Sequence, residues 1–185
     1  MHRGFHVLPE EERRKWQNPE AILSEIGLKP GMTFLDIGCG LGYFTLPAAK
    51  VVGAKGKIYA LDVSAENIAA LNRKTKLAGI KNVVTRVAKA ETTILCQACA
   101  DIVFFGIVLH DFQDPIKVLA NARLMLKPGG KLTNLDWKKE QGPFGPPEAI
   151  RFSQDKAIQL IESQDFKVKS VSNSGLYHYV IVAEL

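Results

Sequence analysis

The stretch Phe34-Leu35-Asp36-Ile37-Gly38-Cys39-Gly40-Leu41-Gly42-Tyr43 decides the fold of this 185-residue chain. It begins with an apolar run of strand length and continues into three glycines, and residues 44–52 then predict a helix. Glycine lets the backbone adopt positive φ angles and lets a ligand approach without a Cβ in its way. The spacing is Gly-x-Gly-x-Gly, because Tyr43 stands where a dinucleotide-binding loop would have its third glycine. A strand, a glycine loop and a helix in this order predict a ligand-binding turn at a sheet edge.

Strand-like and helix-like segments alternate along the rest of the chain. We expect strands at residues 33–37, 57–62, 82–87, 101–105 and 131–136, and helices at residues 18–27, 44–52, 64–78, 114–127 and 153–163. Two last strands, at residues 167–171 and 177–184, are joined by a hairpin signal at residues 173–175. Near-continuous apolar strands that alternate with helices predict an α/β fold, with a mostly parallel sheet covered by helices on both faces.

Length and composition limit the class of protein. With 46% apolar and 23% charged residues, the chain is expected to form one domain over residues 1–185, with residues 1–30 as an N-terminal helical extension. The longest apolar stretch, residues 103–109, is far shorter than the roughly 18 residues of a membrane span, and we expect no signal peptide. Three cysteines cannot all pair, which suits a reducing compartment. We therefore expect a cytoplasmic protein; its oligomeric state stays open.

The net charge of +5 is concentrated in residues 31–100, which hold nine basic and four acidic side chains. Six of the basic residues crowd around one predicted helix and the strand after it: Arg73, Lys74, Lys76, Lys81, Arg86 and Lys89. Such a patch can bind phosphate or nucleic acid. No aromatic residues interleave with these charges, however, as stacking on bases requires. We favour a solvated helix face and expect no nucleic-acid partner.

Two carboxylates accompany the glycine loop. Asp36 immediately precedes the loop, where a carboxylate can hold an amino group or order the loop. Asp62 lies 24 residues after Gly38 and ends the next strand, where a carboxylate can accept hydrogen bonds from both hydroxyls of a ribose. Ligands of parallel α/β sheets bind beyond the carboxyl ends of the strands, so we expect the chemistry at this edge.

These motifs, together with two more, resemble those of a known family. Val108-Leu109-His110-Asp111 follows the fourth strand, and Leu126-Lys127-Pro128-Gly129-Gly130-Lys131 precedes the fifth. With the glycine loop and the Ala60-Leu61-Asp62 strand end, they resemble the class I S-adenosylmethionine-dependent methyltransferases, most nearly the ubiquinone/menaquinone-biosynthesis type. The resemblance implies a Rossmann-like, seven-stranded, mostly parallel sheet with an antiparallel last strand. It also implies S-adenosylmethionine as cofactor and a small-molecule acceptor. Methyl transfer from an activated sulfonium carbon requires no metal, and we expect none.

The resemblance assigns roles to particular residues of the donor site. The residues that would wrap the methionine part of the cofactor are Asp36, Gly38, Cys39, Gly40 and Gly42. Asp62 would bind the ribose, Val63 and Ala90 would contact the adenine, and Gly106 would lie under the sulfonium. One position departs from the family, which usually has an aspartate before the alanine to accept from the adenine amino group. This chain has Lys89 there, and Glu91 is the candidate to replace the aspartate.

The acceptor side carries weaker signals. His110 follows the fourth strand and is a candidate general base, because imidazole titrates near neutral pH; the alternative is a histidine that caps or packs in a loop. Trp137 and Tyr179 are candidates to wall an acceptor pocket or, equally, to pack in the core. Cys96 and Cys99 hold only half the ligands of a structural zinc site, so we interpret them as structural.

Other functions remain open on the sequence. An RNA or protein methyltransferase would use the basic cluster, although residues 105–111 lack the Asn/Asp-Pro-Pro-Tyr/Phe motif of enzymes that methylate amino nitrogens. A binding protein could retain the loop without catalysis, and a nicotinamide-dependent oxidoreductase is disfavoured by the glycine spacing. Salt-sensitive binding to RNA, or cofactor binding without turnover, would distinguish the first two.

Overall fold

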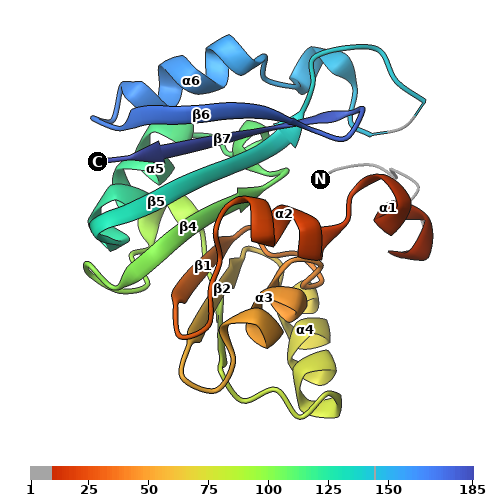
Figure 1. Cartoon of the computed structure of the whole chain (residues 1–185), viewed down its shortest axis with the longest axis vertical. Helices are drawn as coiled ribbons and strands as arrows, with labels where there is room; N and C mark the ends of the chain where they lie inside the picture. The colour runs from red at the N-terminus through yellow and green to blue at the C-terminus, as the bar shows by residue number, and fades with distance from the viewer. Residues whose placement is uncertain (1–9, 144) are drawn as a thin grey trace.

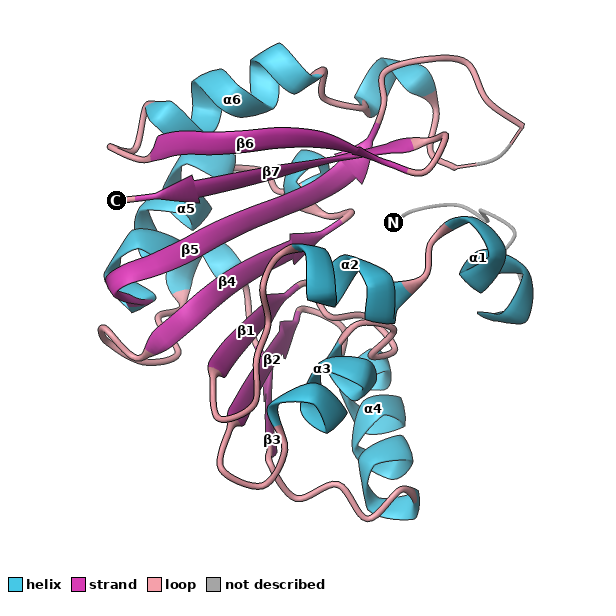
Figure 2. Ribbon diagram, viewed as in Figure 1, coloured by secondary structure: helices cyan, strands magenta, loops and turns pink. Residues whose placement is uncertain are grey.

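A seven-stranded sheet with helices on both faces forms the protein, as a computed structural model that describes residues 10–143 and 145–185 shows (Figures 1 and 2). The strands are β1 (Thr33–Ile37), β2 (Lys57–Asp62), β3 (Val83–Val87), β4 (Ala100–Gly106), β5 (Leu126–Trp137), β6 (Lys167–Ser174) and β7 (His178–Glu184). The α-helices are α1 (Glu10–Trp16), α2 (Pro19–Glu25), α3 (Thr45–Val52), α4 (Ala65–Leu77), α5 (Pro115–Met125) and α6 (Gln154–Glu162). Short 3-10 turns lie at Ala90–Thr92, Leu109–Asp111 and Glu148–Ile150.

The strand order is β3-β2-β1-β4-β5-β7-β6, and β1 to β5 run parallel to one another. The last strand, β7, inserts between β5 and β6 and is antiparallel to both. This confirms the expected fold class: a Rossmann-like, mostly parallel sheet with an antiparallel last strand. The order reverses between β1 and β4, so the carboxyl ends of these two strands open the crevice in which α/β sheets bind ligands.

The two faces of the sheet have separate apolar cores, because successive side chains of a strand point to opposite faces. Phe34, Ile58 and Phe104 pack with buried residues of α2 and α3, whereas Leu35 and Val103 pack with α5 and α6. Helix α4 covers Ala60 on the same face as α3. Figure 1 shows α2, α3 and α4 on one side of the strands and α5 and α6 on the other. None of the described helices is long and apolar enough to cross a membrane.

The expected helix starts are confirmed, but the predicted end of one helix is wrong. The side chains of Asn18, Ser64, Asp114 and Ser153 each accept a hydrogen bond from a backbone N–H in the first turn of the helix that follows. The helix expected at residues 114–127 was to continue to Lys127, but α5 ends at Met125 and β5 already begins at Leu126. Leu126 pairs with Ala100 and the register then shifts, so residues 127–130 form an irregular start of the strand.

Cys96 and Cys99 form a disulfide in the loop between β3 and β4, and Cys39 is free and buried. Ala98 has a φ of 45°, and Ala98 N–H and Cys99 N–H donate to the carbonyls of Leu124 and Met125. The loop is thus tightly folded against the end of α5. This agrees with a structural role for the pair, but it removes the support that unpaired cysteines gave to a reducing compartment.

Candidate active site

The three glycines of the loop after β1 all have positive φ, but for different physical reasons. A Cβ on Gly38 would lie 2.5 Å from Val108 Cγ2, and one on Gly42 would lie 2.4 Å from Leu71 Cδ1. A Cβ on Gly40, whose φ is 52°, would meet nothing within 4 Å. Packing inside the protein therefore requires glycine at the two outer positions. The middle glycine instead faces open space that a ligand can enter.

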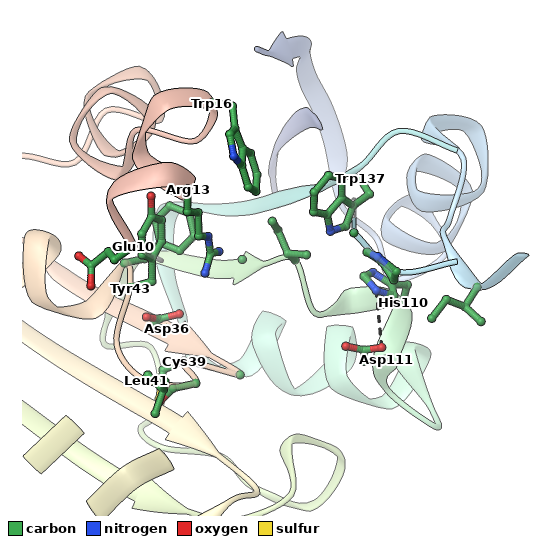
Figure 3. Close-up of a pocket in the computed structure, with 18 of the residues that line it drawn as sticks. Glu10, Arg13, Trp16, Asp36, Cys39, Leu41, Tyr43, His110, Asp111 and Trp137 are labelled. Carbon is green, nitrogen blue, oxygen red and sulfur yellow. Dashed lines mark hydrogen bonds and ion pairs between the residues drawn. The ribbon is translucent and has the colours of Figure 1, made fainter. Parts of the chain in front are cut away.

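A cavity of about 480 Å³ begins at this loop and extends along the carboxyl ends of β4 and β5 (Figure 3). Asp36, Gly38, Cys39, Gly40 and Leu41 line its loop end, and Gly106 and Ile107 line its middle. His110, Asp111 and Trp137 line the far end, and Arg13 and Trp16 of α1 lie above the cavity. Pro146 and Ile150 also line the cavity. One cavity therefore joins the glycine loop to the candidate base.

Asp36 is buried at the end of β1, and its Oδ2 accepts a hydrogen bond of 2.6 Å from Thr45 Oγ1. Burial raises the pKa of Asp36 to about 7; the hydrogen bond from Thr45 opposes this, and the charge of Asp62 adds to it. The carboxyl group is thus about half ionised near neutral pH. A cation placed beside it would hold it ionised, since an opposite charge favours the charged form.

The remaining candidates for the donor site lie at or just after the carboxyl ends of β2 and β3, and none of them is among the residues that line this cavity: Asp62, Val63, Ala90 and Glu91. Asp62 fixes the glycine loop, because its Oδ2 accepts from Gly40 N–H at 2.8 Å while Oδ1 accepts from Ser64 N–H. Val63 is 67% exposed, as an apolar surface open to a ligand would be. Ala90 is buried, and Glu91 accepts from the backbone of Gln113 at 3.3 Å, so its carboxylate is directed toward that loop.

His110 forms a buried pair that the sequence did not reveal. Its Nδ1 lies 2.8 Å from Oδ1 of Asp136, a fully buried carboxylate that also accepts from Trp137 N–H. Its Nε2 lies 3.5 Å from Asp111 Oδ1. Burial opposes the charged form of His110, but the hydrogen bond and charge of Asp136 and the charge of Asp111 outweigh it, so the pKa of His110 is raised. This is the arrangement of a histidine oriented by a carboxylate.

The two aromatic candidates for the acceptor wall have different positions. Trp137 lines the cavity, and its ring lies 5.6 Å from that of Trp16 and 4.2 Å from that of His178. Tyr179 is fully buried in the core, and its hydroxyl donates to the carbonyl of Phe152. The interpretation of Tyr179 as a pocket wall is therefore not supported, because β7 turns its side chain toward α5 and α6.

Three residues that line the cavity come from α1 and had no functional signal in the sequence: Glu10, Arg13 and Trp16. The helix has three acidic residues in its first turn and three basic residues in its last, which predicts only that it forms. Trp16 stacks on His178 at 5.4 Å, and the hydroxyl of Tyr43 donates to the carbonyl of Gln17. These long-range contacts place Arg13 and Trp16 over the site.

Comparison with known proteins agrees with this geometry. Residues 28–175 match the family described as a methyltransferase domain. The chain is 28% identical over 131 residues to the demethylmenaquinone methyltransferase of Staphylococcus aureus (strain MRSA252), covering 71% of this chain and 53% of that protein. It is 33% identical over 116 residues to the ubiquinone/menaquinone biosynthesis C-methyltransferase of Shewanella sp. (strain W3-18-1), covering 62% and 46%. The chain thus spans about half the length of these two relatives.

A solved structure covers nearly the whole chain. The crystal structure of a SAM-dependent methyltransferase from Aquifex aeolicus superposes with a TM-score of 0.89 at 33% identity, covering 93% of this chain and 92% of that one. The family match covers most of this chain and includes every strand except β7. The chain therefore belongs to the methyltransferase-domain family, as a class I S-adenosylmethionine-dependent methyltransferase.

Proposed function

We propose that the protein transfers the methyl group of S-adenosylmethionine to a small, planar acceptor, and that one cavity holds the donor at one end and the acceptor at the other. The observation that carries this proposal is the continuity of the cavity from Gly40 to His110. Methyl transfer needs donor and acceptor to be aligned and water to be excluded. A cavity that runs beneath α1 suits both needs.

The loop end of the cavity fits the cofactor on two observations. The position of a Cβ on Gly40 is open, so an adenosyl-amino acid can approach the backbone there. Asp36 is a buried carboxyl group that lines the cavity, and it would hold the ammonium of the methionine end. Asp62 would bind the ribose, and Val63 and Ala90 would contact the adenine. When bound, the cofactor supplies a methyl carbon already activated on a sulfonium.

A side chain at the far end of the cavity would accept the proton that the acceptor molecule loses. We assign this step to Nε2 of His110, since Asp136 receives the hydrogen bond from Nδ1–H and thereby fixes the tautomer with a free lone pair on Nε2. An acceptor oxygen or activated carbon loses its proton to this nitrogen as it takes the methyl group. The flanking carboxylates of Asp136 and Asp111 then stabilise the imidazolium.

The acceptor end is built for a flat, largely apolar molecule. Trp16 and Trp137 lie above and beside it (Figure 3). Pro146 and Ile150 add apolar surface to the lining of the cavity. Aromatic walls of this kind suit aromatic acceptors. The sequence relatives are named for demethylmenaquinone and ubiquinone/menaquinone, which supports phenolic and quinol compounds as the first acceptors to test.

The experiment combines cofactor binding with turnover. Calorimetry should show that the purified protein binds S-adenosylhomocysteine, and release of that product should then be followed over a panel of phenols and quinols. With an acceptor found, His110→Asn should lower the methyl-transfer rate about 10²–10⁴-fold, the usual effect of losing a general base. Cofactor affinity should stay unchanged, which serves as the folding control. The absence of binding at millimolar ligand would refute the proposed function, and full activity of His110→Asn would refute the role of that residue.

A further inference from the structure

Arg13 is held in one position over the loop end of the cavity. Its Nε donates to Oε1 of Gln17 at 2.6 Å, and its guanidinium carbon lies 3.8 Å from the centre of the Tyr43 ring. The hydroxyl of Tyr43 in turn donates to the backbone carbonyl of Gln17, which ties the end of α1 to the glycine loop. A guanidinium stacked and bonded in this way is oriented before any ligand arrives.

Among the described residues, the terminal nitrogens of this guanidinium have no hydrogen-bond partner. These two nitrogens form the fork that matches a carboxylate. The next residue, Arg14, takes the nearby carboxylates instead, with Glu20 at 2.7 Å and Glu10 at 3.4 Å. Burial lowers the pKa of Arg13, and the charges of Tyr43 and Glu10 oppose this shift only in part. Glu10 also lines the cavity, but it makes no hydrogen bond to Arg13 among the described residues, because its Oε1 accepts from Nε of Arg14.

The charge next to Arg13 in the cavity is complementary to an amino acid. Figure 3 shows the guanidinium of Arg13 and the carboxyl group of Asp36 on the same side of the cavity, away from His110. The methionine end of S-adenosylmethionine carries one ammonium and one carboxylate. We propose that Arg13 binds this carboxylate while Asp36 holds the ammonium, so that α1, which lies outside the family-matched residues 28–175, completes the donor site.

This inference rests on the proposed function, because it concerns the same cofactor. A second cation beside the glycine loop could bind the carboxylate in place of Arg13. Lys74 also lines the cavity, but it is exposed and its Nζ donates to the carbonyl of Leu41 at 3.0 Å. A flexible, solvated ammonium that already has an acceptor is less suited to the carboxylate than a fixed, unpaired guanidinium.

Calorimetry with three ligands tests the assignment. S-adenosylmethionine carries both charges, decarboxylated S-adenosylmethionine lacks only the carboxylate, and 5′-methylthioadenosine lacks the whole amino acid. Arg13→Gln should weaken binding of S-adenosylmethionine about 10–100-fold, the range of a charge-assisted hydrogen bond, and change the other two affinities less than about twofold. Arg13→Lys should recover part of the loss, since it restores the charge without the fork.

Matched variants keep the result interpretable. Arg14→Gln changes the neighbouring arginine on the same helix, and it should leave all three affinities unchanged. The chain has two tryptophans, Trp16 and Trp137, and both line the cavity, so an unchanged intrinsic emission spectrum shows that α1 remains docked in each variant. The inference is overturned if Arg13→Gln weakens all three ligands equally or none, or if Lys74→Gln alone causes the selective loss. If the wild-type protein binds none of the three ligands, the proposed function itself fails.

Discussion

Protonation of Asp36 should control cofactor affinity near neutral pH. Burial raises the pKa of this carboxyl group to about 7 in the free protein, and the proposed contact with the cofactor ammonium requires its ionised form. A pKa of about 7 leaves about one in ten of these groups ionised at pH 6 and about nine in ten at pH 8. Affinity for S-adenosylhomocysteine should therefore rise about tenfold between pH 6 and pH 8, or about 1.4 kcal/mol.

The same linkage predicts proton release on binding. The protein should release about 0.9 proton per ligand at pH 6 and about 0.1 at pH 8, because binding completes the ionisation of Asp36. Titration calorimetry in two buffers of different ionisation enthalpy measures this number directly. Asp36→Asn should bind more weakly, with an affinity that no longer changes between these pH values. For the wild type, 5′-methylthioadenosine, which lacks the ammonium, should show no pH dependence.

Two results would contradict this account of Asp36. Equal affinity of the wild type for S-adenosylhomocysteine at pH 6 and pH 8 would show that the carboxyl group is already ionised or does not contact the ammonium. A slope retained in Asp36→Asn would show that another group titrates.

Three further predictions follow from the loop and from the buried histidine of β7. Gly40→Val should abolish cofactor binding, because its side chain would fill the open space of the cavity. The free energy of unfolding should fall by only about 1–3 kcal/mol, because valine is strained at a φ of 52°. Calorimetry measures the first effect and thermal melts the second, and cofactor binding by this variant would refute the reasoning. Asp62→Ala should weaken S-adenosylhomocysteine by about 1.5–3 kcal/mol, the range for charged hydrogen bonds, and unchanged affinity would remove Asp62 from the site. Burial lowers the pKa of His178 to about 3, assisted by the charges of Arg13 and Arg151, so the unfolded chain binds a proton at this residue from about pH 6.5 downward while the folded protein does not. The contribution of His178 to the free energy of unfolding should fall by about 2 kcal/mol between pH 7 and pH 5. Asp36, with its raised pKa, contributes in the opposite direction, so the wild type should be compared with His178→Phe. Equal shifts of the melting temperature with pH in both proteins would refute the contribution of His178.

Much of the fold is predictable from local sequence because its signals are local. The N-caps at Asn18, Ser64, Asp114 and Ser153 act within one helical turn, and apolar runs of strand length between helices imply a parallel sheet. The hairpin at the end of the chain is also a local signal, although β6 extends to Ser174, beyond the expected end at residue 171. The end of α5 was misplaced, because residues 127–130 read as a helix stop but lie in a strand paired to β4.

The donor half of the candidate site is predictable for the same reason. Residues 36–42 are the end of β1 and the loop that follows it, and Asp62 ends the neighbouring strand, so their proximity follows from the parallel pairing of β1 and β2. The different roles of the three glycines depend on tertiary contacts. Val108 and Leu71, which come from distant segments, determine that the outer two are needed for packing and that Gly40 alone faces open space.

The sequence by itself determined the α/β class, the glycine loop and the family, since each depends on residues near one another in the chain. Only the tertiary structure decided that Asp136 orients His110, that Tyr179 is buried in the core, and that Arg13 and Trp16 lie over the cavity. The contact of Trp16 with His178 joins residues 162 positions apart. Such contacts depend on β7 inserting between β5 and β6, a pairing between distant segments that no local pattern of residues encodes.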